Sequence, residues 1–85
     1  MKYRIVVEKK VEKEASKIPA RHRANIDKSI LSLSSNPRPR ECKKLTDKEG
    51  YRIRTGDYRI LYIIDDETRI VVVYRIKRRG KSTYK

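Results

Sequence analysis

Apolar and polar residues alternate with a period of two across residues 51–64, which is the pattern of half-buried strands. Gly56 and Asp57 interrupt the alternation. They are typical of a tight turn, because glycine tolerates a positive φ and aspartate bonds its own backbone. The pattern therefore predicts a β-hairpin, and the other elements are expected to be organised around it.

The two faces of this hairpin are expected to differ in chemistry. The apolar face carries Tyr51, Ile53, Tyr58, Ile60, Tyr62 and Ile64. The opposite face carries Arg52, Arg54 and Arg59. If the apolar face meets the core, its tyrosines are core residues and the three guanidinium groups project outward on the same side. Guanidinium groups on a rigid sheet form a surface suited to phosphate.

The N-terminal region changes its hydrophobic period once. Residues 3–8 are rich in β-branched side chains and predict a first strand. After it, Val11, Ala15 and Ile18 recur at i, i+4 and i+7. This spacing predicts a short helix over residues 9–17 with one apolar stripe.

A proline separates this helix from a second one. Pro19 ends the first helix, because proline removes a backbone donor and disfavours helix in the residue before it. The second helix is expected over about residues 20–33, and the Ser, Asn and Pro residues at 34–39 break it. Two helices joined by a tight turn form a hairpin that can lie on one face of a sheet.

The remaining segments contain one further strand. Residues 40–50 are polar and irregular, with Leu45 expected to insert into the core. Residues 65–68 are expected to form an acidic turn, and residues 69–76 the last strand. The continuous apolar run at 70–74 indicates burial on both faces and a central place in the sheet.

The element order β-α-α-β-β-β predicts the α+β class. An N-terminal strand and a helical hairpin are followed by a three-stranded antiparallel meander, which completes a small, mostly antiparallel sheet. The length of 85 residues predicts a single small domain over positions 1–85 with a thin core.

The charge of the chain narrows the choice of partners. It has 24 Lys and Arg against 11 Asp and Glu, a net charge of +13. Such a charge steers a protein toward polyanions, with nucleic acid expected first, an acidic protein second and an anionic membrane surface third. The membrane is disfavoured, because no run approaches the ~18 to 20 apolar residues that span a bilayer.

Several other properties follow from what the sequence lacks. A single cysteine cannot form an internal disulfide, and one cysteine with one histidine provides no metal cluster. The N-terminus carries no secretory signal. We therefore expect a cytoplasmic protein without a metal or other cofactor.

Most standard catalytic sites do not fit this sequence. The three glycines are isolated, so there is no glycine-rich phosphate loop. His22 is expected on a helix surface and Cys42 in a loop, which gives no nucleophilic triad. Asp65, Asp66 and Glu67 fit a solvated turn better than a metal site.

The remaining candidates are basic and aromatic. Arg79, or Arg78 in an alternative register, follows the last strand, and Tyr84 comes shortly after. Together with the hairpin arginines, these groups suit metal-free RNA cleavage, in which the RNA 2′-hydroxyl is the nucleophile. Arginines neutralise charge on the phosphoryl oxygens, and a proton donor protects the leaving 5′-oxygen. The same residues also fit a non-catalytic nucleic-acid surface or solvated charges on an exposed sheet face.

Over essentially the whole chain, the sequence resembles RelE-type toxins of the RelE/ParE superfamily. The most specific pieces are Tyr-x-Ile-Arg at 51–54 and Gly-Asp-Tyr-Arg-Ile-x-Tyr at 56–62. An Asn-Pro-Arg break at 36–38, a Lys-Lys-Leu segment at 43–45 and a basic tail ending in Tyr84 also match. The resemblance implies a compact ribonuclease that enters the ribosomal A site, cuts mRNA there and is neutralised by a cognate antitoxin.

The resemblance also implies roles for individual residues. Arg59 matches the sheet arginine that contacts the scissile phosphate, and Arg79 matches the arginine after the last strand. Tyr84 matches the C-terminal tyrosine that stacks on a base and assists proton transfer. Arg52 and Arg54 stand where well-studied relatives carry lysines.

This departure leaves the general base open. Arginine is essentially always protonated, so Arg52 and Arg54 can hold phosphate but serve poorly as a base. The alternatives are Lys77, Lys81, Tyr84 or solvent. The basic residues expected to bind RNA are Lys77, Arg78 and Lys81.

Two other functions fit the same fold. One is a ParE-like toxin that poisons DNA gyrase without nuclease activity, and the other is a non-catalytic RNA-binding module. The basic tail with its tyrosine favours the ribonuclease. In either toxin, so basic a chain predicts an acidic, partly disordered antitoxin that folds as it wraps around its partner.

Overall fold

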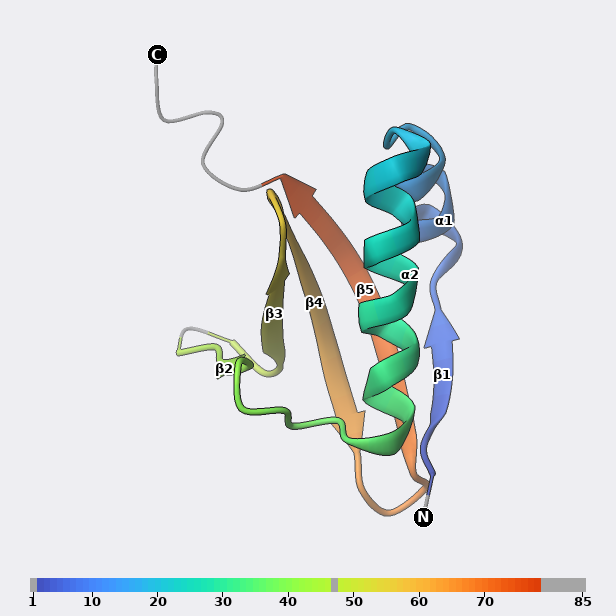
Figure 1. Ribbon diagram of the computed structural model, residues 1–85. Helices are drawn as coiled ribbons and strands as arrows, with labels where there is room; N and C mark the ends of the chain where they lie inside the picture. Colours follow the sequence, from blue (N-terminus) through green and yellow to red (C-terminus); the bar gives the residue numbers. More distant parts are fainter. Residues whose placement is uncertain (1, 47, 79–85) are drawn as a thin grey trace.

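The computed structural model describes residues 2–46 and 48–78 (Figure 1). In chain order the elements are β1 (Arg4–Val7), α1 (Lys9–Ser16), α2 (Ala20–Ser35), β2 (Lys43–Lys44), β3 (Tyr51–Thr55), β4 (Tyr58–Asp65) and β5 (Ile70–Arg78). The strands form one sheet in the order β1-β5-β4-β3-β2. The candidate residues Arg79, Lys81 and Tyr84 lie outside the described residues.

The sheet topology confirms the predicted α+β class. β3, β4 and β5 form an antiparallel meander, and β1 pairs in parallel with β5. β2 was not predicted; it consists of Lys43 and Lys44, which pair with Arg52 and Tyr51 of β3. A strand of two residues is too short to produce a recognisable period-two pattern.

The helical hairpin closes at Pro19, as predicted. α1 ends one residue before the expected boundary and α2 extends two residues beyond it. The guanidinium Nη1 of Arg23 lies 3.5 Å from the carbonyl oxygen of Ser16 and 3.3 Å from that of Ile18. Arg23 therefore satisfies carbonyl groups at the C-terminal end of α1, where the helix itself supplies no donor.

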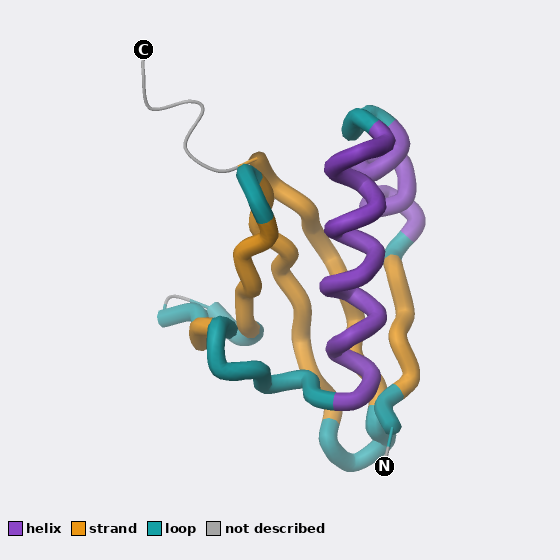
Figure 2. The backbone as a smooth tube through the Cα atoms, viewed as in Figure 1, coloured by secondary structure: helices purple, strands orange, loops and turns teal. Residues whose placement is uncertain are grey.

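The core lies between the helices and one face of the sheet, which we call the inner face (Figure 2). Its buried residues are Val11, Ile18, Ile26, Ile30, Leu33, Ile53, Tyr58, Ile60, Tyr62, Val71, Val73 and Ile76. Tyr51 packs against this cluster, so the prediction that the hairpin tyrosines belong to the core is confirmed. The buried Tyr62 hydroxyl donates to the carbonyl oxygen of Pro37 at 2.8 Å, and burial raises the pKa of this hydroxyl.

A β-bulge sits between β4 and β5. Leu61 is opposite Arg75 while Tyr62 is opposite Val73, which leaves Tyr74 as the extra residue on β5. The bulge shifts the alternation of β5, so that Val73 faces the core and Arg75 lies on the other face of the sheet with Leu61. We call that face the outer face; no helix in the described part of the chain covers it (Figures 1 and 2).

Two expectations about burial need adjustment. β5 lies between β1 and β4, and Val71 and Val73 are fully buried, but Val72 is only partly buried because the outer face has no helical cover. Leu45 was expected in the core, and this prediction was wrong. It is partly buried outside the core cluster, in the loop that follows the edge strand β2, where its amide donates to the carbonyl of Gly50 at 2.9 Å.

Candidate functional site

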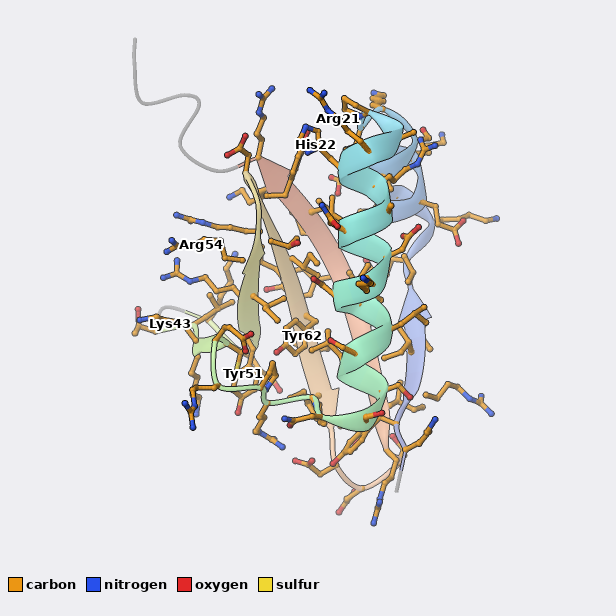
Figure 3. All side chains as sticks on the ribbon, viewed as in Figure 1. Arg21, His22, Lys43, Tyr51, Arg54 and Tyr62 are labelled. Atoms are coloured by element: carbon orange, nitrogen blue, oxygen red, sulfur yellow. The ribbon has the colours of Figure 1, made fainter. Side chains whose placement is uncertain are left out.

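A row of cations crosses the outer face of the sheet next to the turn between β3 and β4. Arg54 of β3 is directly opposite Arg59 of β4, and Arg59 is directly opposite Lys77 of β5. Directly opposite residues share a face of the sheet, so the three side chains lie side by side. Figure 3 shows Arg54 pointing away from the helices. The predicted common orientation of the hairpin arginines is therefore found in the structure.

A second row runs parallel to the first. Lys43 is opposite Arg52, Arg52 is opposite Leu61, and Leu61 is opposite Arg75. Leu61 is only 6% exposed although it lies outside the core cluster. Its neighbours can shield it with their aliphatic stems while their guanidinium groups stay in water. We refer to Lys43, Arg52, Arg54, Arg59, Arg75 and Lys77 as the outer-face cations.

Within the described residues, most of the outer-face cations have no carboxylate partner. Arg75 lies 4.0 Å from a carboxylate oxygen of Glu14, and the other ion pairs within 4.0 Å join Lys10 to Glu8 and Arg38 to Asp66. Like charges placed directly across two strands destabilise a sheet. An arrangement with this cost is suited to a polyanion that supplies the missing negative charge.

The two rows border a cleft of about 350 Å³, which is lined by Glu41, Lys43, Arg52 and Arg54. Guanidinium groups can bind phosphate oxygens through two parallel hydrogen bonds, and an ammonium group adds a point charge. The sequence predicted Arg52 and Arg54 in such a surface. It did not predict that Lys43 and Glu41 join them, because residues 40–50 have no regular pattern of apolar positions. The similarity of the Lys-Lys-Leu segment at 43–45 to RelE-type toxins was the one available indication.

The segment that forms one wall of the cleft is held by an ion pair at its start. Arg38 makes two hydrogen bonds to the carboxylate of Asp66, at 2.9 and 3.2 Å, and its Nε donates to the Tyr51 hydroxyl at 3.1 Å. The Tyr3 hydroxyl donates to Asp66 at 2.7 Å. We call this group of four residues the Arg38–Asp66 latch. It joins the loop after α2 to the turn between β4 and β5.

The latch changes the titration of its members. Hydrogen bonds from Arg38 and from Tyr3 lower the pKa of Asp66 to about 2. The hydrogen bond to Asp66 raises the pKa of Tyr3, and the pKa of Arg38 is raised for the same reason. The acidic turn is therefore more than a solvated turn, because one of its carboxylates anchors the cleft wall.

The same turn shows no metal-binding geometry. The Asp65 carboxylate accepts hydrogen bonds from the amides of Glu67 and Thr68, at 3.1 and 3.3 Å, and closes the turn. Among the described residues, no group of three or more His, Cys, Asp or Glu side chains is placed to hold a metal ion. Neither helix in the described part of the chain has the length and apolarity needed to cross a bilayer.

The last residue of β5, Arg78, does not lie on the outer face. Arg78 is directly opposite Tyr58, whose side chain is buried in the core, so Arg78 lies on the inner face. The Tyr58 ring also lies 5.7 Å from the ring of His22 on α2, on the same side of the sheet. Arg78 therefore does not join Arg59, whereas Lys77 does.

A carboxylate from α1 fixes this end of β5. β1 is shorter than β5, and beyond its end the amide of Ile76 donates to the Glu14 carboxylate at 3.0 Å. Glu14 thus satisfies a backbone donor that the sheet leaves open. No local pattern along the chain indicates this contact, because it joins residues 62 positions apart.

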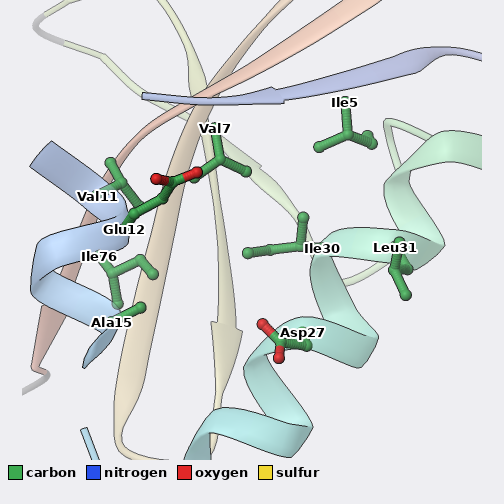
Figure 4. A pocket seen from close by; sticks show the side chains of 9 residues that line it. All are labelled: Ile5, Val7, Val11, Glu12, Ala15, Asp27, Ile30, Leu31 and Ile76. Atoms are coloured by element: carbon green, nitrogen blue, oxygen red, sulfur yellow. The ribbon is translucent and has the colours of Figure 1, made fainter. Parts of the chain in front are cut away.

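A second cavity, of about 480 Å³, opens on the helical side of the molecule (Figure 4). Its lining is mostly apolar and consists of Ile5, Val7, Val11, Glu12, Ala15, Asp27, Ile30, Leu31 and Ile76. Leu31 is 68% exposed at its edge. This apolar groove lies between α1, α2 and β1 and contains none of the outer-face cations.

Comparison with known proteins places these features in a family. Residues 2–82 match the family model described as the ParE toxin of the type II toxin–antitoxin system parDE. A protein of Methanocaldococcus jannaschii that carries the name toxin RelE1 is 32% identical over 89 residues, which cover 100% of this chain and 98% of that protein.

Solved structures agree with this assignment. The chain superposes on a structure of the archaeal RelE–RelB complex from Pyrococcus horikoshii with a TM-score of 0.85 and 30% identity, covering 96% of this chain and 100% of that one. For the RelBE2 toxin–antitoxin complex of Mycobacterium tuberculosis the TM-score is 0.82 with 32% identity, covering 93% and 100%.

Proposed function

This chain belongs to the RelE/ParE superfamily of toxins from type II toxin–antitoxin systems, and on that premise we propose that it is a ribosome-dependent mRNA endoribonuclease. The observation that carries the proposal is the row formed by Arg54, Arg59 and Lys77, which lies beside a cleft lined by further cations. None of these three has a carboxylate partner among the described residues. Such a surface suits an RNA phosphate.

The proposed reaction uses the RNA as its own nucleophile. The 2′-hydroxyl attacks the adjacent phosphorus, and Arg59 stabilises the negative charge that develops on the phosphoryl oxygens. Arg52 and Arg54 hold the phosphate. Arg79, rather than the inner-face Arg78, supplies the arginine after the last strand, and Tyr84 stacks on a base and protonates the leaving 5′-oxygen.

The proposed setting is the ribosomal A site, where the toxin cuts mRNA and stops translation. The proposed partner outside the ribosome is an acidic cognate antitoxin. The solved relatives named above are complexes with RelB-type antitoxins, and the net charge of +13 favours an acidic chain. The apolar groove between α1, α2 and β1 offers an amphipathic antitoxin segment a surface to cover.

A second candidate is a ParE-like toxin that inhibits DNA gyrase. The description of the matching family model favours it. The row of outer-face cations favours the ribonuclease, since binding a protein target does not call for unpaired arginines facing one another across two strands. A non-catalytic RNA-binding module is the third outcome that an experiment should separate.

The test is cleavage of an mRNA on programmed ribosomes, mapped by primer extension. We expect a discrete cut in the A-site codon that requires ribosomes and is lost in Arg59→Ala and Tyr84→Ala. The matched control is Lys28→Ala, which removes one positive charge from the exposed side of α2. Toxic protein that makes no cut, with gyrase-dependent toxicity, would overturn the proposal in favour of the gyrase inhibitor; binding without cleavage or toxicity would favour the RNA-binding module.

A further inference from the structure

The cleft on the outer face contains one group that differs from its neighbours. Three of its lining residues, Lys43, Arg52 and Arg54, are cations, and the fourth is Glu41. Guanidinium and ammonium groups are proton-bearing donors at neutral pH and offer no lone pair to a proton. A carboxylate offers only acceptor oxygens. In the described lining of this cleft, Glu41 is therefore the group equipped to accept a proton.

The backbone around Glu41 is fixed. The amide of Cys42 donates to the carbonyl of Pro39 at 3.0 Å, which places Glu41 inside a hydrogen-bonded turn. The Arg38–Asp66 latch holds the chain just before this turn. Pairing of Lys43 with Arg52 holds the chain just after it. A side chain carried on so short and doubly anchored a segment returns to one place in the cleft.

Within the described residues, the Glu41 carboxylate makes no contact that stabilises the fold. The ion pairs there involve Glu8, Glu14 and Asp66, and no hydrogen bond of the Glu41 side chain is found. A carboxylate that neither closes a turn nor anchors a helix, next to three cations, is free to meet a ligand. Its position is also unusual on an anion-binding surface, because it repels the phosphate that the cations attract.

We infer that Glu41 is the general base of the cleavage reaction, an inference that rests on the proposed function. The carboxylate removes the proton of the 2′-hydroxyl as its oxygen forms a bond to phosphorus. The bond from phosphorus to the 5′-oxygen breaks, and the leaving oxygen takes a proton from Tyr84 or from water. The products are a 2′,3′-cyclic phosphate and a 5′-hydroxyl end, with the abstracted proton on Glu41.

A purely electrostatic role for Glu41 predicts the opposite effect of its removal. Replacing the carboxylate by an amide deletes one negative charge from a cationic cleft, which should tighten RNA binding. If Glu41 only reduces the positive electrostatic potential of the cleft, the same change should also leave the cleavage rate unchanged or raise it. If Glu41 is the general base, its replacement should leave RNA binding unchanged or tighter and should slow the chemical step.

The experiment is single-turnover cleavage on programmed ribosomes across a pH series, with toxin in excess over ribosomes. We expect Glu41→Gln to slow the chemical step by about 10²- to 10⁴-fold, with the acidic limb of the pH–rate profile lost. Glu41→Asp should retain part of the rate. The matched control is Glu49→Gln, an exposed carboxamide substitution outside the cleft lining, which should cleave as the unsubstituted protein does.

The outcomes separate this inference from the function on which it rests. Wild-type protein that cuts while Glu41→Gln cuts equally fast would overturn the role of Glu41 and leave the ribonuclease intact. Wild-type protein that makes no cut would overturn both. Because Glu41 is exposed, the amide variant should melt at the wild-type temperature, and equal melting curves exclude misfolding as the cause of a lost rate.

Discussion

Arg38 and Arg59 carry the same guanidinium group in opposite surroundings. Arg38 is bonded twice to Asp66 and once to the Tyr51 hydroxyl, and its positive charge is locally balanced. Arg59 has cations on both sides, Arg54 on one strand and Lys77 on the other, and no carboxylate within 4.0 Å among the described residues. The partnered arginine organises the molecule, while the unpartnered one is available to a ligand.

On a very basic protein, the presence or absence of a carboxylate partner separates structural from functional charge. Counting cations does not do so, because the chain has 24 of them. What distinguishes the outer-face cations is that packing them together lowers stability unless an anion is bound. Removing Arg38 should therefore lower stability, and removing a cation of the outer-face row should lower function.

Removing an arginine from the outer-face row should act mainly on the chemical step of mRNA cleavage. Arg54→Ala should slow mRNA cleavage by about 10²-fold, because a reacting phosphate that is no longer held in place loses its alignment for attack. The free energy of unfolding should stay the same or rise by up to about 1 kcal/mol, because Arg54 no longer opposes Arg59. Arg54→Lys keeps the charge and serves as the control. If Arg54→Ala slowed cleavage and also lowered the free energy of unfolding as much as Arg38→Ala does, the two kinds of arginine could no longer be distinguished.

The next effect concerns the partnered side. Tyr62→Phe removes the hydroxyl that donates to the carbonyl of Pro37, next to Arg38, and leaves that buried acceptor unsatisfied. Denaturant unfolding should show a loss of about 1 to 3 kcal/mol. Cleavage by the folded protein should remain, since Tyr62 lies on the inner face. Unchanged stability would mean that the loop after α2 is held by the latch alone.

The latch should produce a pH dependence of stability at acidic pH. The pKa of Asp66 is lowered to about 2 in the folded protein, so its contribution is complete above the ordinary aspartate range and is lost as the pH falls toward 2. Melting curves of the wild type and of Asp66→Asn should differ at pH 5 and converge near pH 2. Parallel curves throughout this range would show that Asp66 does not stabilise the fold through its charge.

Removing the lysine at the end of the row should change the salt dependence of RNA binding. Lys77→Ala removes one phosphate contact from the end of the Arg54–Arg59–Lys77 row, so RNA affinity should fall a few-fold at low salt. The slope of log K against log salt should become shallower by about 1. Lys28→Ala on α2 should leave the slope unchanged. Equal slopes for both variants would indicate that RNA binds the protein without using the outer face.

Local periodicity predicted the parts of this molecule that depend on neighbouring residues. The alternation at 51–64 correctly assigned Ile53 and Arg54 to opposite faces, because a strand has a period of two wherever it lies. The same alternation also correctly assigned Tyr51, Tyr58 and Tyr62 to the face that meets the core. The family resemblance added the roles of Arg59, Arg79 and Tyr84, which no structural observation here tests and which stay predictions.

Long-range contacts account for what the sequence did not reveal. The Tyr3 hydroxyl meets Asp66 across 63 positions, and Arg38 meets the same carboxylate across 28. The bulge at Tyr74 shifts one strand against another, and β2 exists only because β3 pairs with it. The position of Glu41 in the cleft follows from these contacts, so a pattern along the chain could not have found it.

The distinction between the two arginines is tested by comparing Arg59→Ala with Arg38→Ala in two measurements on the same samples: thermal melting and single-turnover cleavage on programmed ribosomes. We predict that Arg59→Ala melts like the wild type and has lost cleavage. Arg38→Ala should melt at a lower temperature. At temperatures where it is folded, it should cut more slowly than the wild type, because the turn that carries Glu41 has lost one anchor, but faster than Arg59→Ala. The reverse result, a destabilised Arg59→Ala that still cuts and a stable Arg38→Ala that does not, would contradict this prediction.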